Sequence, residues 1–292
     1  MSPDALRESN APVATQCCGQ NGGPSCLWNT QLYPYTLGPT QLSGFLWYQG
    51  EQNANCGGPT QTAGSVYSTM LQTFVKDLRA KFAQPDLLFG SCLLAPWKKD
   101  GDLISFPELR IAEANLTAHV PRTFTISTLD GGNPANGAVH SPFKQAVGRR
   151  AAQGLAAGAS GTVAKYPFMP PQYASSSASA AGITVRLKAE GLYGAPPVLN
   201  ASVSCPPAIG AKNCESFAVL GADCVWRNAT ATLGADGALL LKAESTTQLI
   251  GSRVSYANWP VVTVTNKAGV PLLPCERSLS ASLLARTTMA DG

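Results

Sequence analysis

The sequence predicts an α/β protein, in which a parallel sheet with helices on both faces is followed by a β-sandwich-like C-terminal region. Between residues 27 and 157, short apolar runs alternate with segments of helical spacing, which is typical of a parallel sheet covered by helices. Beyond residue 182, short strand-like runs are separated by turn residues, which is typical of a β-sandwich. We therefore predict an irregular segment at 1–26, an α/β domain at 27–160, a linker at 161–182, a β-rich domain at 183–278 and a tail at 279–292.

The α/β region contains three predicted strands and three predicted helices. Apolar runs at 45–49, 87–94 and 123–129 have the length of buried strands. Apolar residues recur every four positions across 66–82 and 142–157, which indicates helices. A third helix is predicted at 105–119. Ser105 and Ser141 are N-cap candidates, each with a proline one or two residues later.

The second half reads as linker and then short strands. The stretch 165–181 shows neither helical nor strand periodicity, so we interpret it as a linker. Ala235-Asp236-Gly237 indicates a hairpin turn. Strands are predicted at 183–188, 198–204, 216–220, 225–233, 238–242, 254–257 and 261–265.

Charge and hydropathy argue against nucleic-acid and membrane functions. The net charge is +4, from 21 Lys and Arg against 17 Asp and Glu, and the positive residues form no stripe, so we expect no nucleic-acid partner. No apolar run approaches the ~20 residues that a membrane-spanning helix needs. The first residues of this sequence contain no signal-peptide pattern.

Cysteines and glycosylation sequons indicate an oxidising compartment. The nine cysteines include no C-x-x-C pair, and with only two histidines we expect no metal site. Cys205, Cys214 and Cys224 are closely spaced in a β-rich region, which suits disulfides. Sequons lie at Asn115, Asn200 and Asn228. We therefore expect a secretory, lysosomal or extracellular protein.

The first candidate site follows the strand at 45–49. The apolar run ends abruptly in Gln49-Gly50-Glu51-Gln52-Asn53. Ligands of α/β proteins bind outside the carboxyl ends of the strands, so Gln49, Gly50, Glu51 and Asn53 are candidate site residues. The alternative is an ordinary solvated loop.

The second candidate site follows the strand at 123–129, where Asp130 precedes His140 across a turn-rich loop. A carboxylate that orients an imidazole is the outline of an acyl-transfer site, although Asp and His on one loop are also common as structural residues. The other histidine, His119, is interpreted as a cation at a helix C-terminus. No serine lies in a Gly-x-Ser-x-Gly elbow, so no nucleophile is assigned.

Three blocks of the sequence resemble the sialate O-acetylesterase family. The segment from Leu27-Trp28-Asn29 to Trp47-Tyr48-Gln49-Gly50-Glu51-Gln52-Asn53 resembles the family's WYQGESN-type strand end, and the block from His140 to Arg149 resembles its IHP…KQ-VG-R block. Arg253 to Pro260 and Asn266 to Pro274 resemble its C-terminal motifs. Together the blocks cover roughly residues 25 to 275 in the family's order.

The resemblance implies an SGNH-type serine esterase that removes O-acetyl groups from sugars, typically sialic acids, without metal or organic cofactor. His140 would be the general base and Asp130 would orient it. Gln49, Gly50 and Asn53 would lie by the oxyanion or hold the strand end, with Glu51 supporting them. An O-acetylated sugar or sialoglycan is the implied partner, and the oligomeric state is not readable from the sequence.

The chain departs from the family pattern at the nucleophile. The family's GQSN-type serine block has no counterpart here, and many relatives carry the orienting Asp two or three residues before the histidine, where this chain has Gly137 and Ala138. We therefore expect an SGNH-like sheet that is incomplete at its N-terminus, a chain that starts within the family's catalytic domain, and little triad-based turnover. The alternatives are an inactive carbohydrate-binding protein and a piece that does not fold alone.

Overall fold

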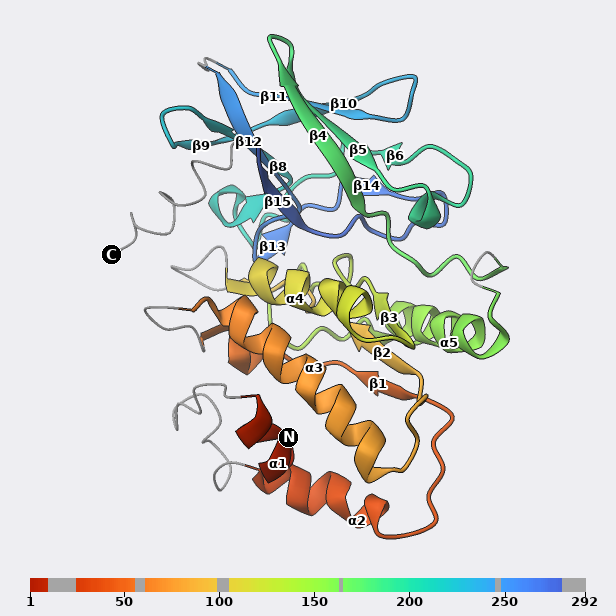
Figure 1. The fold of residues 1–292 in the computed structure, drawn as a ribbon. Coiled ribbons are helices and arrows are strands. Elements are labelled where there is room, and N and C mark those ends of the chain that lie inside the picture. The colour runs from red at the N-terminus through yellow and green to blue at the C-terminus, as the bar shows by residue number, and fades with distance from the viewer. Residues whose placement is uncertain (10–24, 56–60, 99–104, 163–164, 245–247, 280–292) are drawn as a thin grey trace. The chain divides into compact units, whose positions relative to one another are not determined.

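The computed structural model describes residues 1–9, 25–55, 61–98, 105–162, 165–244 and 248–279 (Figure 1). The chain forms two compact units. Unit 1 comprises residues 1–94, 108–126 and 145–166, and unit 2 comprises residues 95–107, 127–144 and 167–292. We describe each unit by itself.

The sheet of unit 1 is parallel, as predicted. Its strands are β1 (Phe45–Trp47), β2 (Phe89–Cys92) and β3 (Thr123–Ile126), in the order β1-β2-β3. Phe45 pairs with Phe89, and Phe89 pairs with Thr123. Each strand is shorter than the apolar run that predicts it, because the chain leaves the ladder before its apolar residues end.

Helices cover both faces of this sheet, so unit 1 has three layers (Figure 1). On one face, Phe74 of α3 (Ala63–Lys81) packs its ring 4.7 Å from that of Trp47. On the same face, Thr125 donates a hydrogen bond to the Glu113 carbonyl of α4 (Ser105–His119) at 3.3 Å. On the other face, a Cβ built on Gly154 of α5 (Lys144–Ser160) would lie 2.2 Å from the Phe124 ring. Glycine therefore lets α5 approach the sheet closely.

Two helix starts differ from the sequence prediction. The segment 1–26 is not wholly irregular, because Ser2 caps α1 (Pro3–Glu8) by accepting from the Ala5 amide at 3.0 Å. This helix is too short to show a hydrophobic period. The helix predicted from Pro142 begins at Lys144 instead, because Ser141 Oγ accepts from the Phe143 amide at 3.1 Å in a separate turn. The remaining helical segments are η1 (Trp28–Leu32), α2 (Tyr33–Thr36) and η2 (Glu51–Asn55).

Unit 2 is built on two four-stranded antiparallel sheets. Their orders are β10-β11-β5-β4 and β15-β12-β8-β9. Apolar side chains from both sheets, including Ile183, Val219 and Leu241, form one buried cluster. The strands are β4 (Tyr173–Ser179), β5 (Gly182–Leu187), β8 (Phe217–Gly221), β9 (Trp226–Asn228), β10 (Thr230–Leu233), β11 (Leu239–Lys242), β12 (Leu249–Val254) and β15 (Cys275–Ser278).

Shorter elements complete unit 2. Two-stranded pairs join β13 (Trp259–Pro260) to β7 (Cys214–Glu215) and β14 (Val264–Thr265) to β6 (Val198–Leu199). Short helical turns lie at η4 (Glu190–Leu192) and η5 (Ala211–Asn213). The predicted hairpin turn is confirmed, since β10 pairs with β11 and Gly237 adopts φ +77°.

The prediction of a structureless stretch at 165–181 is wrong, and so is the strand predicted at 254–257. Residues Tyr173–Ser179 form β4, an edge strand that is mostly exposed. An exposed edge strand of Ser and Ala has no apolar face and therefore no alternating pattern to read. The strand near residue 254 runs from Leu249 to Val254 and ends where a strand was predicted to begin. Ser255, with φ +53°, breaks the extended backbone there.

Candidate active site

A buried tyrosine of α3 anchors the backbone at the carboxyl end of β1. Tyr67 of α3 is 4% exposed, and its hydroxyl donates to the Gln49 carbonyl at 2.5 Å. The Trp47 indole Nε1 donates to the same hydroxyl at 3.1 Å. Because the phenolic oxygen both accepts and donates, it fixes the strand end and the tryptophan in one arrangement.

The turn after β1 is closed by its own side chains. Gln49 Nε2 donates to Asn53 Oδ1 at 3.0 Å, the Gly50 amide donates to Glu51 Oε2 at 3.0 Å, and the Asn53 amide donates to the Gly50 carbonyl at 2.8 Å. The Asn53 amide nitrogen Nδ2 meets no hydrogen-bond partner among the described residues. The turn therefore presents one preset amide donor.

Gly50 sits where a larger residue would collide. A Cβ at this position would lie 3.2 Å from Tyr67 Oη and 3.3 Å from both Glu113 Oε1 and Leu94 Cδ2. Such distances are below ordinary van der Waals contact, so the backbone approaches these side chains as closely as only glycine allows.

Two fully buried residues of α4, Arg110 and Glu113, bind the backbone just after β2. Arg110 and Glu113 are both 0% exposed. Arg110 Nε donates to the Leu94 carbonyl at 2.8 Å, and Glu113 Oε2 accepts from the Leu94 amide at 3.1 Å. Together they bind both backbone polar groups of one residue, Leu94, and this fixes the backbone two residues beyond β2.

Burial dominates the electrostatics of this cluster. Desolvation raises the pKa of Glu113 well above its usual range, although Arg110 opposes the shift. Desolvation also raises the pKa of Tyr67 and lowers that of Arg110 to about 9. Burial therefore disfavours the charged form of each of these three groups, and the attraction between the charges of Arg110 and Glu113 opposes that effect for these two.

Sequence reasoning missed Tyr67, Arg110 and Glu113. Arg110 and Glu113 lie four residues after Phe106 and Leu109, which are fully buried. They therefore share the apolar face of the helix. A charged residue on the apolar side of a helical pattern was the signal that could have identified them.

The predicted residues Asp130 and His140 belong to unit 2, whereas Gln49, Gly50, Glu51 and Asn53 belong to unit 1. Both Asp130 and His140 are exposed. Asp130 is not without a partner in the structure, and its pairing with His140 stays a prediction.

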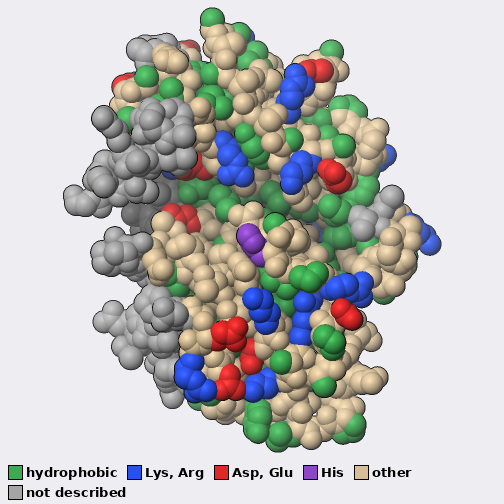
Figure 2. Space-filling model, in the orientation of Figure 1, with side chains coloured by type: hydrophobic (Ala, Val, Ile, Leu, Met, Phe, Trp, Pro, Cys, Tyr) green, Lys and Arg blue, Asp and Glu red, His purple; other side chains and the backbone are tan. Residues whose placement is uncertain are grey.

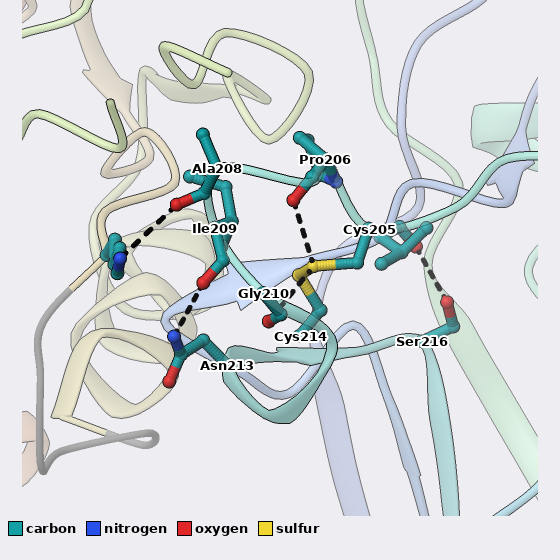
Figure 3. The surroundings of a disulfide bond; sticks show 10 residues. Cys205, Pro206, Ala208, Ile209, Gly210, Asn213, Cys214 and Ser216 are labelled. Carbon is teal, nitrogen blue, oxygen red and sulfur yellow. Dashed lines mark hydrogen bonds between the residues drawn. A yellow bond between two sulfur atoms is a disulfide. The ribbon is translucent and has the colours of Figure 1, made fainter. Parts of the chain in front are cut away.

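The structure shows which described cysteines are bonded and whether the sequon asparagines are exposed. Cys205 and Cys214 form a disulfide, as their spacing suggested (Figure 3). Cys224 is an exposed thiol. Cys17, Cys18 and Cys56 lie outside the described residues. Asn115, Asn200 and Asn228 are all exposed.

One face of the described surface shows no strong charge separation (Figure 2), and the described residues show no metal-ligand cluster or membrane-spanning helix. Positive and negative side chains are interspersed on the face that Figure 2 shows. Within the described ranges, no three His, Cys, Asp or Glu side chains gather as a metal-binding group. No helix in that part of the chain is long and apolar enough to cross a bilayer.

The fold is that of an α/β protein with a parallel sheet, followed by antiparallel sheets. A solved structure, the carbohydrate acetylesterase XAC1771 of Xanthomonas citri, superposes with a TM-score of 0.69 at 22% identity, over 88% of this chain and 55% of that one. The shared architecture is an SGNH-like parallel sheet with helices, followed by an antiparallel strand-rich region.

The family follows from the sequence comparison. The family model described as "Carbohydrate esterase, sialic acid-specific acetylesterase" matches residues 29–156. The sialate O-acetylesterase of Mus musculus is 31% identical over 162 residues, which span 49% of this chain and 28% of that protein. Over residues 29–156 the chain therefore matches the sialic acid-specific acetylesterase family of carbohydrate esterases, the family that the three sequence blocks resemble.

Proposed function

We propose that this chain acts on O-acetylated sugars, with O-acetylated sialic acid as the first candidate substrate, through a Ser-His-Asp mechanism whose serine is not assigned to any residue of this sequence. The observation that carries the proposal is the family match over residues 29–156, which include the anchored turn after β1. The identity to the mouse sialate O-acetylesterase supports the choice of substrate.

In the proposed mechanism His140 is the proton carrier. As general base it removes the proton from the attacking hydroxyl, and as general acid it returns the proton to the departing sugar oxygen. Asp130 orients the imidazole and stabilises the imidazolium. Both side chains are exposed, so the imidazole and carboxylate are open to a substrate.

The turn after β1 is proposed to stabilise the oxyanion. Asn53 Nδ2 is oriented by the hydrogen bond that Gln49 donates to Asn53 Oδ1. An amide donor that is fixed in advance stabilises developing negative charge without reorganising, and loss of one such donor typically lowers kcat about 10²–10³-fold. Gly50 and Glu51 hold the turn, since the Gly50 amide is already bound to Glu51 Oε2.

The accessory features support an oxidising compartment. The disulfide between Cys205 and Cys214 and the three exposed sequons suit a secreted or lysosomal protein, which we propose for this chain. A mobility shift on peptide N-glycosidase treatment, absent after Asn→Gln changes at positions 115, 200 and 228, would identify the modified sites.

The test measures binding, labelling and turnover on one preparation. We expect the folded chain to bind an O-acetylated sialic acid by calorimetry, to release little acetate and to resist labelling by a fluorophosphonate. Stoichiometric labelling of one serine, with acetate release lost in His140→Ala and kept in His119→Ala, would locate the nucleophile here and overturn the expectation of low turnover. A folded chain that neither binds nor cleaves the sugar would refute the proposed function.

Binding without any contribution of His140 favours the second candidate, a carbohydrate-binding protein without catalysis. The observation that supports this candidate is that the sequence contains no GQSN-type serine block. Equal affinity of the wild type and His140→Ala for sialic acid with and without the O-acetyl group would support it.

A further inference from the structure

The loop between Asp130 and His140 is fixed at two glycines. Gly137 is buried with φ +68°, and a Cβ there would lie 2.4 Å from Lys98 Cβ and 2.9 Å from Ile209 Cδ1. Gly132 is buried too, and its Cβ would lie 2.7 Å from both Pro96 Cβ and Trp259 Cη2. Both positions are in contact with side chains that come from distant parts of unit 2.

The loop is also folded tightly upon itself between these anchors. The Gly137 amide donates to the Asn133 carbonyl at 2.8 Å. Asn133 Oδ1 accepts from the Ala135 amide at 3.1 Å, and Asn136 Oδ1 accepts from the Ala138 amide at 2.9 Å. These bonds hold residues 133–138 in one compact turn, which ends two residues before His140.

The segment closed by the disulfide of Cys205 and Cys214 supplies Ile209. This side chain is 1% exposed although it lies on an irregular loop. Its amide donates to the Pro206 carbonyl at 2.9 Å, and its carbonyl accepts from Asn213 Nδ2 at 2.6 Å (Figure 3). The disulfide joins the two ends of this segment, nine residues apart, and thereby holds Ile209 in place.

Lys98 ties the two loops together. Its amide donates to the Gly137 carbonyl at 2.9 Å, and its ammonium donates to the Ala208 carbonyl at 3.2 Å. The other glycine, Gly132, lies against Trp259, and Trp259 pairs in a strand ladder with Cys214 itself. Both glycine anchors of the His140 loop therefore contact residues that the disulfide fixes directly or through one neighbour.

We propose that the disulfide-closed segment from Cys205 to Cys214 is a positioning element for His140, and that Ile209 and Lys98 are the residues that transmit its effect through Gly137. The inference rests on the proposed function for the role of His140, but its structural part is independent of that role. Opening the disulfide releases Ile209, loosens Gly137 and lets His140 sample a wider range of positions.

The first test follows His140 itself. The chain has two histidines, so the imidazole signals in an NMR spectrum are two, and His119 is an internal reference. We expect the double change Cys205→Ser with Cys214→Ser to move or broaden the His140 signal while the His119 signal stays unchanged. Cys224→Ser, at an exposed thiol, is the matched control and should change neither signal.

The second test measures backbone opening at the anchors. We expect Ile209→Ala and Lys98→Met each to raise amide hydrogen exchange in peptides covering 131–140 by about tenfold or more, through increased local opening. Ile209→Val, which keeps a branched side chain against Gly137, should restore most of the protection. If Ile209 and Lys98 only stabilised the fold in general, the increase in hydrogen exchange would not be confined to these peptides.

The outcomes separate this inference from the proposed function. Unchanged His140 signals and unchanged exchange at 131–140 in folded Ile209→Ala and Lys98→Met would overturn the positioning role, whatever the activity. Increased exchange together with a wild type that neither binds nor cleaves O-acetylated sugar would uphold the coupling and refute the function. If the double cysteine variant does not fold, the two single variants decide.

Discussion

Tyr67 donates its phenolic hydrogen to the Gln49 carbonyl at 2.5 Å while it accepts a hydrogen bond from the Trp47 indole at 3.1 Å. One side chain of α3 thereby joins the last residue of β1 to the first residue of the turn region. This buried contact fixes the start of the turn that carries Asn53, so the candidate site depends on a residue that faces the core.

Replacing Tyr67 by Phe should destabilise unit 1 without disturbing its packing. The change leaves the Gln49 carbonyl and the Trp47 indole without their buried partner, and an unpaired buried polar group costs about 1–3 kcal/mol. Chemical denaturation should report that loss as a lower transition midpoint. Tyr35→Phe, at a side chain that is 61% exposed, should leave the midpoint unchanged, and an equal midpoint for both variants would contradict the anchoring role.

Glu113→Gln should destabilise unit 1 less than Glu113→Ala. Burial raises the pKa of the Glu113 carboxyl well above the usual range, and Glu113→Gln retains an oxygen that accepts from the Leu94 amide. We expect that variant to lose less than about 1 kcal/mol, and Glu113→Ala to lose about 2–4 kcal/mol through the unpaired amide and the cavity. Denaturation of the two variants at pH 7 makes the comparison. If Gln is as damaging as Ala, the carboxyl group is ionised in the fold.

Gly50 and Gly148 should respond to alanine in opposite directions. Gly50→Ala brings a Cβ within 3.3 Å of Tyr67 Oη and Glu113 Oε1, and overpacking of this kind costs about 1–3 kcal/mol. Gly148 lies in α5, where a Cβ would meet nothing within 4 Å, so its change to Ala should stabilise by about 0.5–1 kcal/mol. Thermal melts of both variants give the two signs, and a stabilised Gly50→Ala would show that the turn has room to move.

Glu215 should make unit 2 less stable as the pH rises. Burial raises its pKa to about 7, more strongly than Arg253 lowers it, while Glu276 adds to the rise. A carboxyl with a raised pKa is neutral in the fold, so its contribution is complete below the unfolded pKa of ~4.5 and is lost as the pH increases through 7. The difference of about 2.5 pKa units corresponds to a loss of about 3 kcal/mol between these limits.

The comparison that checks this prediction uses Glu215→Gln. The variant should match the wild type near pH 4 and be more stable at pH 8, in denaturation curves recorded at both values. Glu244→Gln changes an exposed carboxyl and should follow the wild type throughout. A difference between Glu215→Gln and the wild type that is constant with pH would exclude titration of Glu215 as the cause.

The parallel half of the fold was readable because its strands are buried. The runs around Phe45, Phe89 and Phe124 are apolar on both faces, and the helices between them carry an apolar stripe. The edge strand β4 was not readable, since its Ser and Ala residues have little to bury. Strand pairing between distant segments decides such elements, and no local pattern reports it.

The candidate site was readable only in part, for a related reason. The polar residues after β1 stand out because they interrupt an apolar run, and the turn that they form is the one that the structure contains. Tyr67, Arg110 and Glu113 did not stand out, because their importance lies in which backbone groups they reach. The roles of Asp130 and His140 stay predictions.

The interleaving of the two units limits how this protein can be rearranged. The chain passes from one unit to the other five times, and residues 95–107 and 127–144 of unit 2 are inserted between segments of unit 1. A gene fragment encoding 167–292 alone would lack Gly137, which lies against Ile209, and Lys98, which donates to the Ala208 carbonyl. The β-rich unit therefore cannot be exchanged between proteins as a single cassette, and recombination within this lineage must exchange both units or neither.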